Sequence, residues 1–312
     1  MNIYIHSLLD DHNASILEKT FGKNHSISFR QEKVAPNQPT PSFLKAEAIL
    51  GNPPVSWFSN GQPENLVFWQ IDSAGFDQFK GIITKARVAN MGDWFAWPCA
   101  ETIIAGILGL YRGLPILTRL QSEKKWVGQP LRSDLHLLHH KKVVVLGTGT
   151  IGKAVRSILN GFQAETRMVA RTDPQADIHS KEELLKILPD IDLVINTLPG
   201  AAGVFVDETF LQSMKPGSVY ANIGRGSTTD ESALIKLLQT GHLAGAVLDV
   251  TEKEPLPVEN PLWTLPNVIL TQHTGGGQVN EDIGKVNNFI ENLNRYLSGQ
   301  NLRFEVDLSR GY

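Results

Sequence analysis

Residues 142–152 have the types and spacing to bind a phosphate-bearing ligand. An apolar run from Val143 to Leu146 predicts a buried parallel strand; three glycines spaced G-x-G-x-x-G and a predicted amphipathic helix over 153–162 follow it. In this context the first glycine permits a tight turn, the second lets backbone approach a pyrophosphate, and the third lets helix and strand pack closely. The helix N-terminus would present unpaired N–H groups to the phosphates. We therefore predict a dinucleotide site formed by Gly147, Thr148, Gly149, Thr150, Ile151 and Gly152.

The end of the next predicted strand, 166–170, indicates which dinucleotide binds. In NAD sites an acidic residue at this place holds the ribose hydroxyls, but here the strand ends at Ala170, and Arg171 and Thr172 follow. A guanidinium suits a 2′-phosphate, and the missing carboxylate removes a repulsion. We therefore expect NADPH to be preferred over NADH, which could also bind, with Arg171 and Thr172 at the cofactor. In the alternative, Arg171 is a solvated surface residue and Asp173 serves the ribose after a small register shift.

Arg225, Glu254 and His273 are the residues best suited to chemistry, because each follows one of three successive predicted strands. Ligands in open parallel sheets bind beyond the carboxyl ends of the strands. Taken singly, Arg225 could be a helix-capping or surface residue, Glu254 a solvated charge, and His273 a satisfied core histidine. Together, beside a dinucleotide motif, they favour a catalytic cluster.

Alternating strand and helix signals from residue 141 onward must position these residues. We predict strands at 142–146, 166–170, 192–196, 218–223, 244–249 and 267–271, and helices at about 152–161, 181–187, 207–213 and 231–239. This repeated alternation indicates an open parallel sheet with helices on both faces.

The first hundred residues resemble a smaller α/β unit. We predict strands at 3–6, 46–50 and 66–71, a helix at 15–21, an irregular connection at 33–42 and a loop at 51–63. A long helix begins at Pro98 and is apolar on nearly all sides, which is typical of a buried helix, either within its domain or against a second subunit.

Composition limits the function classes. The chain has 312 residues, which suggests two domains, and its net charge of −3 with a pI of about 6.3 indicates no nucleic-acid or anionic-membrane partner. The single cysteine, Cys99, excludes an intrachain disulfide and is typical of a buried small residue rather than a nucleophile. We see no signal peptide, and the apolar stretch 103–110 is too short to span a bilayer, so we expect a cytoplasmic protein.

A histidine-rich segment could be interpreted as a metal cluster. His136, His139 and His140 lie close to Asp134 in a largely polar stretch, 121–140. Their spacing matches no metal-binding motif that we can defend. We therefore expect a solvated loop and no metal.

The order of these motifs resembles the D-isomer-specific 2-hydroxyacid dehydrogenase family. The resemblance covers nearly the whole chain and is best from 142 to 274, and the ending 305–312 resembles the glyoxylate/hydroxypyruvate reductase branch. The matching pieces are the glycine motif, Leu193–Pro199, Asn222-x-x-Arg225-Gly226, Leu248-Asp249-Val250 before Glu254-Pro255, Pro261-Leu262-Trp263, Pro266-Asn267-Val268 and Thr271-x-His273.

The resemblance implies the fold: two Rossmann-like or flavodoxin-like, doubly wound parallel-sheet α/β domains with a cleft between them. Residues 1–98 and 286–312 would form the substrate-binding domain, and 99–285 the dinucleotide-binding domain. The last helix, about 286–298, would cross back to the first domain. Family members are usually dimeric through the long helix after Pro98, so we expect a homodimer; whether Trp126 reaches the partner subunit's site stays open.

The resemblance also implies residue roles for the reduction of a small 2-keto acid, with glyoxylate or hydroxypyruvate as substrate. His273 would be the proton donor, Glu254 would pair with it and favour the imidazolium, and Arg225 would bind the carboxylate and polarise the keto oxygen. The remaining implied contacts are those of Leu198, Pro199 and Asp249 with the cofactor and of the Ala74 and Gly75 backbone with the substrate.

Two departures and two rival functions accompany this interpretation. Gln272 stands where the family usually has proline, which could alter how His273 is aimed, and Ala170-Arg171 departs from the NAD pattern. The main alternative function is a cofactor-sensing dimeric module with little turnover. Formate oxidation is disfavoured, since that branch carries glutamine at the place of Glu254.

Overall fold

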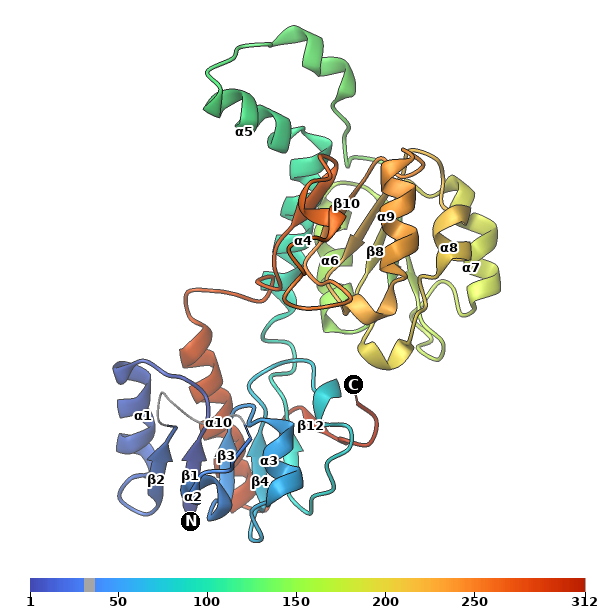
Figure 1. The fold of residues 1–312 in the computed structure, drawn as a ribbon. Coiled ribbons are helices and arrows are strands. Elements are labelled where there is room, and N and C mark those ends of the chain that lie inside the picture. The colour runs from blue at the N-terminus through green and yellow to red at the C-terminus, as the bar shows by residue number, and fades with distance from the viewer. Residues whose placement is uncertain (31–36, 312) are drawn as a thin grey trace. The chain divides into compact units, whose positions relative to one another are not determined.

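The computed structural model describes residues 1–30 and 37–311, which form two α/β units (Figure 1). The first unit contains Met1–Phe95 together with Gln278–Tyr312, and the second contains Ala96–Gly277. Each unit has its own six-stranded sheet. The fold class predicted from the sequence, two doubly wound parallel-sheet units, is confirmed.

The sheet of the first unit has the strand order β12-β5-β4-β3-β1-β2, and only β12 runs antiparallel to its neighbour. Two helices cover one face through an apolar cluster that includes Leu17 and Phe289; the other face packs Phe43 and Trp57 against Tyr4 and Trp69. Its elements are β1 Asn2–Ile5, α1 Asp11–Phe21, β2 Ser26–Phe29, α2 Pro41–Leu44, β3 Ala48–Leu50, α3 Val55–Asn60, β4 Phe68–Gln70, η1 Asp77–Phe79, β5 Arg87–Ala89, α10 Glu281–Leu297 and β12 Glu305–Val306.

The sequence analysis missed several short elements of this unit. Strands β2 and β5 have only four and three residues, which is too short for a periodic signal. Helix α3 lies inside the stretch 51–63, which was predicted to be a loop from its glycine, proline, serine and asparagine content. The irregular connection expected at 33–42 lies partly outside the described residues.

The chain passes between the units at 95/96 and 277/278, where the sequence analysis placed the boundaries at 98/99 and 285/286. Helix α10 begins at Glu281, five residues before the predicted start at 286. Its first turn belongs to the first unit, because Gly284 lies so close to the indole of Trp94 that a Cβ there would overlap the ring. The large apolar residues that pack on the sheet, such as Phe289, begin only after that turn.

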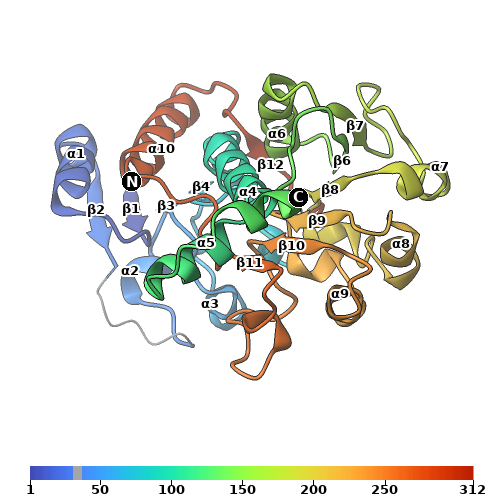
Figure 2. The ribbon, with the colours of Figure 1, turned by 90° about the horizontal axis from the view of Figure 1, so that it is seen from above.

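The sheet of the second unit is entirely parallel, with the strand order β11-β10-β9-β8-β6-β7 (Figure 2). Its strands are covered on both faces, which explains their nearly continuous apolar sequences. The six predicted strands are all present. They are β6 Lys142–Leu146, β7 Glu165–Val169, β8 Leu193–Asn196, β9 Val219–Asn222, β10 Gly245–Leu248 and β11 Val268–Leu270.

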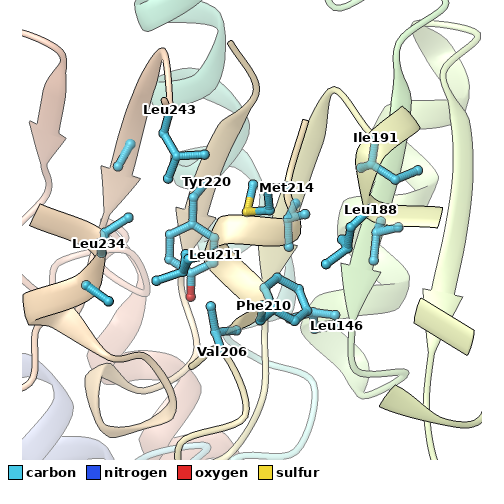
Figure 3. Packing of buried hydrophobic residues seen from close by; sticks show 14 of the residues in the cluster. Leu146, Leu188, Ile191, Val206, Phe210, Leu211, Met214, Tyr220, Leu234 and Leu243 are labelled. Carbon is cyan, nitrogen blue, oxygen red and sulfur yellow. The ribbon is translucent and has the colours of Figure 1, made fainter. Parts of the chain in front are cut away.

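Helices α4 and α6 pack together, and α7, α8 and α9 build a separate apolar cluster with the sheet (Figure 3). Full burial of one such leucine or phenylalanine contributes roughly 1.5–3 kcal/mol. The helices begin at side-chain caps where the sequence offers them: Ser180, Asp207 and Asp230 accept backbone N–H groups at the starts of α7, α8 and α9. Their bounds are α4 Ala96–Tyr111, α6 Thr150–Gly161, α7 Lys181–Ile187, α8 Glu208–Ser213 and α9 Glu231–Gln239, with 3-10 turns η3 Leu188–Asp190, η4 Gly200–Ala202, η5 Gly226–Thr228 and η6 Pro261–Trp263.

A helical arm follows α4. It comprises α5, Leu114–Ser122, and the 3-10 segment η2, Gln129–Asp134. The segment η2 lies within the stretch 121–140, which was predicted to be a loop. Among the described helices, none is by itself long and apolar enough to cross a membrane; α4 and α5, bent by 69° at their junction, pass that test only as a pair.

Candidate active site

The predicted dinucleotide turn lies between β6 and α6. Gly147 has a φ of +103°, which favours glycine, and a Cβ at Gly152 would overlap the carbonyl of Gly147. A Cβ at Gly149 would meet no protein atom within 4 Å, so packing within the protein does not require glycine there. No side chain caps the start of α6. The turn therefore offers open backbone and uncapped N–H groups, which fits a pyrophosphate.

The turn after β8 adjoins the glycine turn. The Thr197 hydroxyl donates to the carbonyl of Leu146 at 2.8 Å, and the side-chain oxygen of Asn196 accepts the backbone N–H of Leu198 at 2.9 Å. These bonds fix Leu198 and Pro199 beside Gly147. The structure thus places these two predicted cofactor contacts next to the predicted phosphate-binding turn.

The segment after β7 gives a mixed result for cofactor choice. Arg171 and Thr172 are exposed. The carboxylate of Asp173 accepts the backbone N–H of Gln175 at 2.9 Å. That bond, and a second from the hydroxyl of Thr148 in the glycine turn, hold the pKa of Asp173 below its ordinary value. Asp173 therefore lies close to the glycine turn, as the alternative in which it serves the ribose requires.

His273 and Glu254 form the pair that the sequence analysis predicted. The Nδ1 of His273 lies 2.6 Å from Oε2 of Glu254, and the two side chains are 53% and 36% exposed. The other carboxylate oxygen, Oε1, accepts the backbone N–H of Thr251 at 3.0 Å, which fixes the carboxylate from its own loop. Within the described part of the chain, Nε2 of His273 has no hydrogen-bond partner. This nitrogen is therefore placed to exchange a proton with a ligand.

Asp249 organises the turn that carries His273. This side chain is only 5% exposed, and its Oδ1 accepts the hydroxyl of Thr271 at 2.6 Å and the backbone N–H groups of Thr274 and Gly275 at 3.1 and 3.0 Å. Its backbone carbonyl accepts the N–H of His273 at 2.6 Å. The sequence analysis expected Asp249 only as a cofactor contact and missed this role, since no local pattern indicates it.

The turn is also unusual in its backbone. Gln272 and His273 have φ values of +54° and +55°, in the left-handed region that non-glycine residues rarely adopt. Proline, with its φ fixed near −65°, could not occupy position 272 in this conformation. The departure from the family pattern at Gln272 therefore has a structural consequence: the bonds to Asp249 hold a turn that a proline would forbid.

Arg225 follows β9 and opens η5. Its backbone carbonyl accepts the hydroxyl of Thr228 at 2.6 Å and the amide of Asn222 at 3.1 Å, and its Nη1 donates to the carbonyl of Gly224 at 2.9 Å. A buried network below it joins the hydroxyl of Tyr220 to Asn196 and Thr229. Tyr220, Asn196 and Thr228 are fully buried. These contacts fix the backbone of Arg225 relative to the turn after β8.

The predicted substrate loop follows β4 in the first unit. Three successive carbonyls are occupied: that of Ser73 accepts the N–H of Met91 at 3.2 Å, that of Ala74 the amide of Asn90 at 2.6 Å, and that of Gly75 the hydroxyl of Ser73 at 2.7 Å. Among the described residues, none accepts a hydrogen bond from the N–H groups of Ala74 and Gly75. Two neighbouring N–H groups are suited to an anion. The sequence analysis missed Asn90, which comes from a distant segment.

The histidine-rich segment shows no metal-binding geometry. The rings of His139 and His140 lie 3.7 Å apart, and His139 pairs with Gln163 at 3.1 Å. Within residues 1–30 and 37–311, no three His, Cys, Asp or Glu side chains come together as metal ligands would.

Comparison with known proteins places the chain in a family. The family model described as "D-isomer specific 2-hydroxyacid dehydrogenase, NAD binding domain" matches residues 104–275. An uncharacterised protein of Corynebacterium melassecola is 34% identical over 80% of this chain and 85% of its own. Glyoxylate/hydroxypyruvate reductase B of Pectobacterium atrosepticum is 33% identical over 73% and 75%. The solved NADPH-dependent glyoxylate/hydroxypyruvate reductase of Sinorhizobium meliloti has a TM-score of 0.80 at 24% identity, covering 98% of each chain. This chain belongs to the D-isomer specific 2-hydroxyacid dehydrogenase family.

Proposed function

We propose that this protein is an NADPH-preferring reductase that converts small 2-keto acids, glyoxylate or hydroxypyruvate, to D-2-hydroxy acids. The observation that carries the proposal is the 2.6 Å contact between His273 and Glu254 in a family whose members reduce such acids. The presence of Arg225, Glu254 and His273 together argues against a module that only senses the cofactor. The proposal therefore favours an enzyme over that alternative.

His273 donates the proton in the proposed reaction. Reduction of a keto group adds a hydride to carbon, which a bound reduced nicotinamide supplies, and a proton to oxygen. The Nε2 of His273 gives the proton to the keto oxygen, and Glu254 at Nδ1 fixes the orientation of the ring. Because the ring is half-exposed, solvent can return the proton after each turnover.

The substrate carboxylate has two candidate binding groups in the proposal. Arg225 has a planar guanidinium that can bind a carboxylate and polarise a keto oxygen. In the first unit, the unpaired N–H groups of Ala74 and Gly75 are suited to a carboxylate. Both are carried by backbone that other hydrogen bonds hold in place, which reduces the entropy lost on binding.

The cofactor proposal can be tested at one pair of side chains. The start of α6 would hold the pyrophosphate and Arg171 the 2′-phosphate, and Leu198, Pro199 and Asp249 would be further cofactor contacts. Arg171→Ala should weaken NADPH binding much more than NADH binding. Asp173→Ala is the matched variant, and should improve NADPH relative to NADH by removing a carboxylate beside Thr148. Equal losses of both cofactors in Arg171→Ala would contradict the proposed selectivity.

The activity itself is tested by following NADPH, then NADH, by absorbance with glyoxylate, hydroxypyruvate, pyruvate and a bulkier phenyl keto acid. The proposal expects fast turnover of NADPH with one of the first two. His273→Ala should keep cofactor affinity and lower kcat sharply, while His139→Ala, an exposed histidine of the same unit, should change neither. Tight cofactor binding without turnover on any acid would favour the sensing module.

We also propose a homodimer formed through the arm after α4. Leu114, Ile116 and Leu117 of α5 are exposed, and Trp126 is 98% exposed. Between α4 and α5 lies an open groove of about 650 Å³, lined by apolar residues such as Gly106 and Ile269. Light scattering should give twice the chain mass, and Leu117→Glu should give the monomer. A cytoplasmic location stays a prediction.

A further inference from the structure

The loop that carries Glu254 has little regular structure and needs anchors. It runs from Thr251 to Asn260 between β10 and η6, and most of its residues, Glu254 included, are exposed. Inside the loop, the hydroxyl of Thr251 donates to the carbonyl of Lys253 at 3.0 Å. Such local bonds shape the loop but do not hold it to the sheet. Its position relative to His273 must therefore be set by contacts with neighbouring elements.

Glu231 supplies two of these contacts, one near each end of the loop. Its Oε2 accepts the backbone N–H of Glu252 at 2.9 Å, and its Oε1 accepts the side-chain amide of Asn260 at 2.8 Å. Asn260 in turn caps η6 by accepting the N–H of Leu262 at 2.9 Å. One carboxylate thus bonds to both ends of the loop, and Glu254 lies in the sequence between the two bonded residues.

Gly226 brings the same loop against the turn of Arg225. A Cβ at Gly226 would overlap the carbonyl of Thr251 and approach the backbone nitrogen of Glu252 to 2.6 Å. The start of the loop therefore packs directly on η5, the turn that Arg225 opens. Glu231 stands just beyond that turn, at the first position of α9, so it can pull Glu252 onto η5.

Helix α9 does not need this carboxylate to cap its start. Asp230 already caps α9 by accepting the N–H of Ala233 at 2.9 Å. Across the described part of the chain, Glu231 makes no ion pair, and both of its oxygens are spent on the loop. A hydrogen bond to an ionised acceptor is stronger than a neutral one, which suits a residue that must immobilise exposed backbone.

We propose that Glu231 is a positioning residue for proton transfer, which clamps the loop 251–260 so that Glu254 stays against Nδ1 of His273. The inference rests on the proposed function, in which this pair delivers the proton. Glu231 acts through the loop and touches neither substrate nor cofactor. Its loss lets Glu254 spend time away from the imidazole, so that the ring is no longer held in the orientation that proton transfer needs.

The test compares kcat, KM for the keto acid and the dissociation constant of NADPH in the full-length wild type, Glu231→Ala, Glu231→Gln, Glu254→Gln and Glu208→Ala. Glu208 is the matched control, because it also begins a helix directly after an aspartate cap but bonds only the side chain of Gln212 and lies 3.8 Å from Lys236. Thermal unfolding of each variant shows separately what the helix start contributes to stability. Glu231→Gln keeps the size of the side chain and one acceptor oxygen, so it can replace Glu231→Ala in the comparison if the alanine variant folds poorly.

The proposal expects Glu231→Ala to lower kcat about tenfold, within the range of up to ~10²-fold seen for small misplacements of catalytic groups. The dissociation constant of NADPH should stay at the wild-type value, kcat of Glu254→Gln should fall as well, and kcat of Glu231→Gln should lie between that of Glu231→Ala and that of the wild type, with Glu208→Ala at the wild-type kcat. If the Glu231 variants keep the wild-type kcat while Glu254→Gln loses it, the positioning role is refuted and the proposed function stands. If Glu254→Gln itself keeps the wild-type kcat, the proton-donating pair is refuted.

Discussion

The turn that carries His273 should depend on a single buried oxygen. Oδ1 of Asp249 accepts three hydrogen bonds from this turn, from the hydroxyl of Thr271 and the N–H groups of Thr274 and Gly275. Without them, the bond from the N–H of His273 to the carbonyl of Asp249 remains, but its acceptor is uncharged and opposes less strongly the cost of two successive non-glycine residues with positive φ. We therefore expect Asp249→Ala to release the turn and displace the imidazole from Glu254.

The magnitude follows from the exposure of the three donors. A hydrogen bond to a charged acceptor contributes about 1.5–3 kcal/mol. Gly275 is buried, but Thr271 is half-buried and Thr274 is exposed, so water can replace part of two of the bonds. The expected loss is therefore about 3 kcal/mol rather than three times that value. If these roughly 3 kcal/mol are added to the activation free energy of proton transfer, kcat should drop about 10²-fold.

The assay needs a variant that keeps the acceptor, and Asp249→Asn provides it, since an amide oxygen can take the place of Oδ1. We expect Asp249→Asn to retain a melting temperature near that of the wild type and to lose less kcat than Asp249→Ala, with the dissociation constant of NADPH measured for both by fluorescence. Equal losses of kcat in the two variants would refute the reasoning, because the charge of Asp249 and not its hold on the turn would then matter.

Three further outcomes test other features. Burial, with the nearby Arg30, lowers the pKa of His6 to about 4 from its ordinary 6.5. Between these pH values the unfolded chain binds more protons than the folded one, so the free energy of unfolding should fall by up to about 3 kcal/mol as the pH drops from 6.5 to 4. Urea unfolding of His6→Gln at several pH values should lack this fall. Burial raises the pKa of Cys99 to about 12, so a thiol reagent should label the native protein at neutral pH only after denaturant is added; prompt labelling would contradict its burial. Gln272→Pro should lower kcat strongly because its backbone has a φ of +54°, whereas Gln272→Gly should keep kcat near the wild type; similar kcat values in the two variants would mean that the turn adopts another conformation in solution.

The sequence by itself determined most of the second unit. Long apolar runs such as Val143–Leu146, separated by helical segments, admit one arrangement, a parallel sheet covered on both faces. Parallel strands all end at the same edge of the sheet. Because Arg225, Glu254 and His273 each follow a predicted strand, the strand pattern alone assigns them to that edge. The glycine spacing likewise determined the shape of the turn before α6, because backbone conformation and close packing are local properties.

Tertiary structure alone decided how these residues are held. The bonds of Asp249 to the turn at 271–275, of Asn90 to Ala74 and of Glu231 to Glu252 and Asn260 join segments that no local periodicity relates. The contact of Asp173 with Thr148 was equally hidden, since it depends on where the chain turns after β7. Sequence pattern reports which face of an element is buried, whereas the partner of a polar side chain is set by the packing of distant elements, which is established only once the chain has folded.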